Sequence, residues 1–136
     1  MKRLLLVDDN PLFREALALL LEWNMGLDSV EAESVAEARR ILGASRDEVG
    51  LAVVDIDLPG GDGIELIEEL CKAETEVTVL ALTTGRSLQR YASALQAGAE
   101  EVLTLGTNIE LLIGVIRRLA DGVEPKEDKT YGIWCK

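Results

Sequence analysis

The sequence predicts an α/β fold in which a doubly wound parallel sheet is covered by helices on both faces. Three observations support this prediction. Short apolar runs of strand length recur along the chain, and most lack polar alternation, as expected of strands buried on both faces. Helical patterns with clear start signals fall between these runs. The regular order of strand and helix, repeated five times, favours parallel strands joined by right-handed crossovers.

Five segments are expected to form the strands. Three of them are almost continuously apolar, the second is weaker, and the fifth is short. In chain order they are 4–7, 29–32, 51–54, 77–82 and 101–103. Each has an ordinary length for a strand in a globular domain.

Helices are expected between the strands. Asn10 followed by Pro11 combines a preferred N-cap with proline at the first helical position, which predicts a helix from there to about Trp23. Capping boxes, in which a capping residue precedes Glu by three positions, predict three further helix starts. The boxes are Ser34 with Glu37, Asp62 with Glu65 and Thr107 with Glu110, and they open helices over about 34–42, 63–72 and 108–120.

One more helix is expected over 88–97, with Ser87 as its cap and Gly98 as its stop. After the last helix the chain turns polar. We therefore expect one domain over residues 1–122, followed by a linker or C-terminal tail over 123–136.

The composition is that of a single acidic domain. A chain of 136 residues with 48% apolar residues can build one buried core. The 25 acidic residues outnumber the 14 basic ones, and a net charge of -11 repels nucleic-acid phosphates and anionic membranes. We therefore expect no direct nucleic-acid contact by this chain and no membrane association.

The two cysteines and the N-terminal residues exclude further classes of protein. Cys71 and Cys135 lie far apart and the chain has no histidine, which disfavours a zinc site or a disulfide framework. The apolar run before Asp8 is far too short for a signal sequence or a membrane span. A cytoplasmic location is expected.

Acidic and hydroxyl side chains collect where the strands are expected to end. Asp8 and Asp9 follow the first strand, Asp55 closes the third, and Thr83 closes the fourth. Ligands of open α/β sheets bind at the carboxyl ends of the strands. Three carboxylates brought together there disfavour one another's ionisation unless a cation neutralises them. Mg²⁺ is the expected ion, because it takes one or two carboxylates and keeps water and phosphate oxygens as its other ligands.

The segment from Asp8 to Asn10 also has a simpler interpretation, because Asx residues before Pro11 are ordinary helix caps. Taken alone, this segment fits either interpretation. Asp55 favours a functional site. A charged residue that closes an apolar run is hard to place in a core, whereas a metal ligand or a nucleophile accounts for it.

Taken in order, these residues resemble the receiver domains of two-component response regulators. The resemblance spans residues 3 to about 120 and is closest to regulators with a LuxR-type helix-turn-helix output domain. It is carried by Asp8-Asp9, the segment 53–63 around Asp55, Thr83, and the turn Ala97-Gly98-Ala99. The resemblance implies a flavodoxin-like (βα)5 fold with strand order 2-1-3-4-5.

The resemblance also implies roles for the acidic residues. Asp55 would be the phosphoacceptor, and Asp8, Asp9 and Asp55 would hold Mg²⁺ together with the backbone carbonyl of Asp57. An aspartate nucleophile forms an acyl phosphate, and Mg²⁺ neutralises charge on the group being transferred. The implied partner is a histidine kinase or a phosphotransfer protein. The chain would be a signalling module in a phosphorelay and not an enzyme.

The switch positions depart from the family pattern. Thr83 would contact the phosphoryl group, with Thr84 beside it where the family usually has a small residue. The lysine that receivers normally carry after the fifth strand is replaced by Leu105, and the aromatic switch position by Val102. Leucine offers the phosphoryl group neither charge nor a hydrogen bond. The alternative function is a degenerate receiver that acts as a phosphorylation-independent interaction or dimerisation module.

The motif Asp55-Ile56-Asp57 is also similar to the nucleophile and acid pair of haloacid-dehalogenase-like phosphohydrolases. Those enzymes place the motif after the first strand and need a later lysine, so the context disfavours this alternative. Arg86 and Arg90 are interpreted as solvated residues near the pocket mouth, although Arg86 could reach a phosphate.

The last predicted helix has more apolar surface than docking on a sheet requires. One stripe suffices for docking, and it consists of Leu111, Leu112, Val115 and Leu119. A second stripe beside it consists of Ile109, Ile113, Ile116 and Ala120. We expect Ile109, Ile113 and Ile116 to form an interface that could join two copies, with signalling through the face of the last two helices. The alternative is a wider buried arc.

Overall fold

The computed structural model describes residues 3–59, 62–72 and 77–121. Within these ranges five strands alternate with five helices, and every strand pair is parallel. The strand order β2-β1-β3-β4-β5 confirms the predicted flavodoxin-like (βα)5 fold. The elements are β1 (Arg3–Val7), α1 (Pro11–Met25), β2 (Ser29–Ala32), α2 (Val35–Ser45), a 3-10 turn (Arg46–Glu48), β3 (Val49–Asp55), α3 (Gly63–Lys72), β4 (Thr78–Thr83), α4 (Leu88–Ala97), β5 (Glu101–Thr104) and α5 (Ile109–Asp121).

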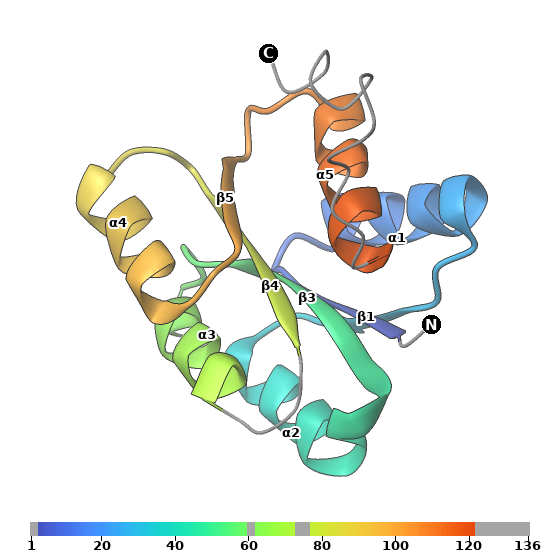
Figure 1. Cartoon of the computed structure of the whole chain (residues 1–136), viewed down its shortest axis with the longest axis horizontal. Coiled ribbons are helices and arrows are strands. Elements are labelled where there is room, and N and C mark those ends of the chain that lie inside the picture. Colours follow the sequence, from blue (N-terminus) through green and yellow to red (C-terminus); the bar gives the residue numbers. More distant parts are fainter. Residues whose placement is uncertain (1–2, 60–61, 73–76, 122–136) are drawn as a thin grey trace.

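Helices cover both faces of the sheet, with α1 and α5 on one side and α2, α3 and α4 on the other (Figure 1). Successive residues of each central strand enter opposite cores because side chains alternate along a strand. In β1, Leu4 and Leu6 pack toward α1 and α5, whereas Leu5 and Val7 pack toward α2 and α3. This double burial explains why the central strands are continuously apolar.

Most predicted helix starts are confirmed by cap hydrogen bonds. The Asn10 side chain accepts from the backbone N–H groups of Leu12 and Phe13, and Ser87 accepts from that of Arg90. Ser34 and Asp62 likewise accept from the backbone N–H groups of Glu37 and Glu65, the last residues of their boxes. These caps satisfy N–H groups that the first helical turn leaves without a partner.

The predicted capping box at the last helix is wrong. Asn108 Oδ1 accepts from the backbone N–H of Glu110 at 2.7 Å, so Asn108 is the capping residue of α5. The Thr107 hydroxyl instead lies 3.2 Å from the Thr104 hydroxyl. The reason is that Asn108 directly precedes the first helical residue, where an Asx side chain reaches the second N–H of the helix.

The predicted second stripe of α5 is only partly exposed. Ile109 is 43% exposed and Ile113 is half-buried, but Ile116 is fully buried in the core beneath α1 and α5. The prediction of Ile116 as an interface residue is therefore wrong, since its side chain is already used to dock the helix. A groove of about 510 Å³ lies beside the remaining stripe, lined by residues that include Asn24, Ile113 and Arg117.

The predicted tail at 123–136 lies outside the described residues. Among the residues that are described, no helix is long and apolar enough to cross a membrane.

Candidate functional site

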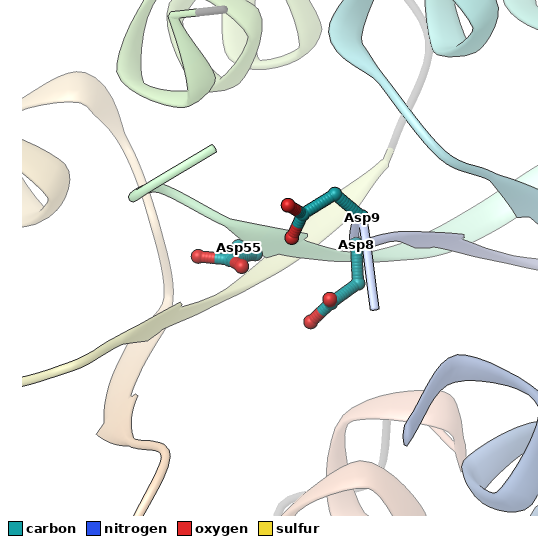
Figure 2. A group of neighbouring side chains, drawn as sticks. All are labelled: Asp8, Asp9 and Asp55. Atoms are coloured by element: carbon teal, nitrogen blue, oxygen red, sulfur yellow. The ribbon is translucent and has the colours of Figure 1, made fainter. Parts of the chain in front are cut away.

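The predicted acidic residues meet at the carboxyl ends of two neighbouring strands. Asp8 and Asp9 follow β1, and Asp55 is the last residue of β3. One carboxylate oxygen from each of the three residues lies within 4.8 Å of the others, and Figure 2 shows the three side chains gathered at this edge of the sheet. They come together because β1 and β3 are adjacent and pair in parallel, so that both chains end at the same edge.

Helix capping does not account for Asp8 and Asp9. Asn10 caps α1, whereas Asp8 Oδ1 accepts a hydrogen bond from the backbone N–H of Asn10 at 2.8 Å. Asp8 is 5% exposed, and its backbone N–H donates to Ala32 at 3.0 Å. The Arg14 guanidinium donates to the Asp8 carbonyl and holds this corner against β2 through Glu31. Neither residue caps the helix, so the carboxylates of Asp8 and Asp9 can act together with that of Asp55 in holding a cation.

Asp55 is an acid held in an unfavourable environment for its charge. It is 5% exposed, and its Oδ1 accepts from the backbone N–H of Asp57 at 2.8 Å. Burial, reinforced by the charges of Asp8, Asp57 and Asp9, raises the pKa of Asp55 to about 6 despite that hydrogen bond. Burial likewise raises the pKa of Asp8, and the charge of Asp9 adds to the effect.

This donor set fits a hard divalent cation. Three carboxylates, two of them buried, supply oxygen ligands and an excess of negative charge. Burial first, and this charge second, raise the pKa values of Asp8 and Asp55. A cation would relieve that excess, and oxygen ligands of this kind suit Mg²⁺. Asp8, Asp9 and Asp55 would hold the ion.

The Asp57 side chain points to a different set of partners. Its Oδ2 accepts from the Thr83 hydroxyl at 2.9 Å and from the backbone N–H of Thr84 at 2.7 Å, and its Oδ1 accepts from Arg90 Nε at 3.2 Å. Partial burial alone would raise the pKa of Asp57. The hydrogen bonds from Thr84, Thr83 and Arg90 outweigh it and hold the pKa below its ordinary value. Asp57 is therefore an ionised carboxylate at the rim of the pocket.

Arg90 was missed as a site residue by the sequence interpretation, which placed it in solvent. The guanidinium pairs with Asp57, and its second nitrogen donates to the carbonyl of Ile56. Nothing in the local pattern signals this contact, because it joins α4 to the loop after β3 across more than thirty residues. Arg86 is exposed, as expected.

Val102 and Leu105, the two positions interpreted from the sequence as departures from the family pattern, lie in different environments. Val102 is buried in the core under α3 and α4. Leu105 is 39% exposed directly after β5, and its backbone N–H donates to the Thr83 carbonyl at 2.7 Å. Leu105 is therefore the residue that flanks Thr83 at this end of the sheet.

A five-stranded parallel sheet carries a carboxylate trio at the ends of β1 and β3 and a threonine at the end of β4, the arrangement of an α/β module with a candidate cation site at one sheet edge. The model of the response regulator receiver domain matches residues 4–117. The chain belongs to this family, which serves two-component signal transduction.

A curated relative supports the assignment. The chain is 41% identical over 100 residues to the DNA-binding transcriptional activator DevR/DosR of Mycobacterium tuberculosis, covering 73% of this chain and 45% of the relative. The chain spans between 26% and 58% of the lengths of the first curated relatives that it matches.

Two solved structures share the fold. A LuxR-family two-component response regulator from Aurantimonas sp. SI85-9A1 is 30% identical with a TM-score of 0.72, over 88% of this chain and 85% of that one. The response regulator TrrA of Thermotoga maritima, solved in complex with Mg²⁺ and BeF, is also 30% identical. Its TM-score is 0.74, over 88% of this chain and 99% of that one. One of these two structures is thus of a LuxR-family regulator.

Proposed function

We propose that Asp55 accepts a phosphoryl group from a histidine kinase or a phosphotransfer protein. Mg²⁺ would be held by Asp8, Asp9 and Asp55 together with the backbone carbonyl of Asp57. The observation that carries this proposal is the placement of Asp55, which is 5% exposed at the end of β3 with carboxylate oxygens of Asp8 and Asp9 within 4.8 Å. Relatives lend support, since TrrA is described in complex with Mg²⁺ and BeF, and the receiver family works with histidine kinases.

The chemistry follows from an aspartate nucleophile. An Asp55 carboxylate oxygen forms a bond to phosphorus as the bond between phosphorus and the donor nitrogen breaks, and the freed nitrogen takes a proton from water. When bound, Mg²⁺ would neutralise the charge on the transferring group. The chain's own contribution is to aim Asp55 with the hydrogen bond from the Asp57 amide, and to bury it away from competing water.

Intact-mass measurement tests this proposal directly. Incubation with phosphoramidate and Mg²⁺ should add one phosphoryl group to the parent chain, and the adduct should be stable to acid but labile to hydroxylamine, as an acyl phosphate is. Asp55→Asn should abolish the addition, whereas Asp47→Asn, in the exposed 3-10 turn, should leave it intact. Equal incorporation in Asp55→Asn would show that another residue is the acceptor.

A phosphorylation-independent interaction module is the second candidate function, and Leu105 favours it. By the family resemblance, the position beside Thr83 after β5 normally holds a lysine, and here it holds an apolar side chain that is 39% exposed. Leu105→Lys should therefore enlarge the phosphorylation-dependent NMR shifts around Thr83, α4 and α5, with little effect on Mg²⁺ affinity. A complete, slow-exchange shift in the parent protein on phosphorylation would rule out this second function.

The signalling surface is proposed to lie on the last two helices. Ile109 and Ile113 remain partly exposed on α5, which leaves an apolar stripe for a second copy of the chain.

A further inference from the structure

Three hydrogen-bond donors converge on one carboxylate at the rim of the acidic pocket. The Thr83 hydroxyl and the Thr84 amide both donate to Asp57 Oδ2, at 2.9 and 2.7 Å. Arg90 Nε donates to Asp57 Oδ1 at 3.2 Å. The donors come from the end of β4 and from α4, so this single side chain ties both elements to the loop after β3.

The phosphoacceptor position borders the same donors. Asp55 Oδ1 accepts from the Asp57 amide at 2.8 Å, and Asp55 is paired in register with Leu82, the residue before Thr83. Arg90 also donates to the carbonyl of Ile56, the residue that follows Asp55. A group attached to the Asp55 carboxylate would therefore lie beside the end of β4, which carries Thr83, and beside the Ile56–Asp57 segment that Arg90 contacts.

The donor set suits a phosphoryl group better than it suits a carboxylate of the chain. A guanidinium, a hydroxyl and a backbone amide are the usual partners of phosphate oxygens. A phosphoryl group carries roughly -1.5 to -2 charges and three acceptor oxygens, against one charge and two oxygens on Asp57. The Arg90 side chain is 42% exposed, so its ion pair with Asp57 is screened by solvent and can be exchanged at low cost.

We propose that Arg90 supplies the cation for the phosphoryl group on Asp55, beside the threonine that the family uses for this contact, and that Asp57 occupies Arg90 and Thr83 in the unmodified protein until the phosphoryl group takes them over. Arg90 is then the cation that binds the phosphoryl group, and before phosphorylation the Asp57 carboxylate accepts the hydrogen bonds that the phosphoryl group accepts afterwards. The inference rests on the proposed phosphorylation of Asp55. The exchange breaks and forms hydrogen bonds only, and it releases the Asp57 carboxylate to water.

The test compares matched variants of the full chain in phosphoramidate and Mg²⁺. Arg90→Gln removes the proposed cation, Arg90→Lys restores the charge, and Arg86→Gln removes the charge of an exposed neighbour in the same region. Asp57→Asn removes the charge of the placeholder but keeps its backbone carbonyl. The rate of adduct formation is followed by intact mass, and the Arg90 Nε–H and Thr84 amide signals are followed by NMR before and after phosphorylation.

The variants should differ clearly in the rate of adduct formation. Arg90→Gln should slow adduct formation roughly tenfold or more, as expected for losing a charge-assisted hydrogen bond to the transferring group. Arg90→Lys should recover part of the rate, and Arg86→Gln should match the parent. Asp57→Asn should accelerate the reaction by up to roughly fivefold, because the partly exposed contact it removes no longer has to be broken. Phosphorylation of the parent should shift both NMR signals.

Several results would overturn the inference. Adduct formation in Arg90→Gln at the parent rate, or an equal slowing in Arg86→Gln, would show that Arg90 has no specific contact with the phosphoryl group. Unmoved Arg90 and Thr84 signals in the phosphorylated parent would show that Asp57 keeps its partners. In these cases phosphorylation of Asp55 still stands. Failure of the parent to form any adduct would instead contradict the proposed function itself.

Discussion

Gly63, the first residue of α3, lies directly against the backbone of Asp55. A Cβ at Gly63 would stand 2.9 Å from the Asp55 carbonyl oxygen and 2.7 Å from the Ile56 Cα, closer than side chains approach backbone atoms in folded proteins. The start of α3 and the end of β3 are therefore packed so tightly that only glycine fits, and the position of Asp55 depends on it.

Gly63→Ala should accordingly destabilise the protein. The neighbouring atoms belong to the backbone and cannot rotate away, so the added methyl group should cost about 1–3 kcal/mol of unfolding free energy by overpacking. It should also weaken Mg²⁺ binding by displacing Asp55. Gly43→Ala is the matched control, because Gly43 lies within α2 with nothing near its Cβ position. That change should stabilise the helix by about 0.5–1 kcal/mol. Urea denaturation that ranked the two variants in the opposite order would contradict this packing.

A second glycine is required where α4 ends. Gly98 has φ of +119°, and a Cβ there would lie 2.6 Å from the Cys71 sulfur on α3. Gly98→Ala therefore combines backbone strain with a clash, whereas Gly26→Ala, at φ of +63° with open space around it, meets strain alone. Strain of this kind costs on the order of 1–3 kcal/mol, and Gly98→Ala should exceed Gly26→Ala by a clear margin in thermal unfolding. Equal losses would show that α3 moves aside freely.

The stability of the metal-free protein should fall as pH rises through the range in which Asp55 titrates. Burial, followed by neighbouring charges, raises the pKa of Asp55 to about 6, above the value of about 3.9 expected for an unfolded chain. The folded form binds this proton more tightly, so its contribution is fully present below about pH 4 and is lost as pH rises past about 6. The loss is on the order of 3 kcal/mol.

Urea denaturation of the parent and of Asp55→Asn, across this pH range and without Mg²⁺, measures that contribution. The difference in unfolding free energy between the two proteins should shrink or reverse toward acid pH. The stability of the variant should keep a weaker dependence on pH, because burial also raises the pKa of Asp8. Parallel pH profiles for the two proteins would show that Asp55 does not carry the effect.

Magnesium should bind the pocket and stabilise the fold. At a concentration a hundred times its dissociation constant the ion should add about 2.7 kcal/mol to the unfolding free energy. Asp9→Asn should weaken the affinity at least about tenfold, since even partners outside the ligand shell contribute that much, whereas the exposed Asp47→Asn should not. Titration calorimetry gives both affinities. Binding that survives Asp9→Asn combined with Asp55→Asn would place the ion elsewhere.

Self-association, if α5 provides the interface, should depend on Ile113. Placing a charge on the partly exposed stripe beside the groove should disfavour contact with a second copy, so Ile113→Glu should sediment as a monomer at concentrations where the parent does not. Leu19→Glu is the matched control, because Leu19 is also 45% exposed but lies on α1, outside the proposed surface. Loss of association in the control alone would move the interface to α1. A parent that is monomeric at high concentration would remove this interface altogether.

Local patterns accounted for most of the elements. The apolar runs predicted all five strands to within two residues at either end, and the predicted helices 63–72 and 88–97 match α3 and α4. Such features are readable because strand burial, N-caps and glycine stops depend on neighbouring residues in the chain. Where two neighbours compete for one role, the pattern failed. Asn108 caps α5 although Thr107 completes the capping box, since only the residue directly before the helix has the required reach.

What the sequence by itself determined is the alternation of strands and helices and the placement of Asp8, Asp9, Asp55 and Thr83 at strand ends. The strand order came from the family resemblance, because local patterns do not say which strands become neighbours. Tertiary structure alone decided that Ile116 is buried in the core and that Arg90 and Thr83 donate hydrogen bonds to the side chain of Asp57. Burial on a helix depends on what packs against it. A contact between α4 and the loop after β3 depends on how two elements that are distant in the sequence pack together. The spacing of residues along the chain predicts neither this contact nor the burial of Ile116.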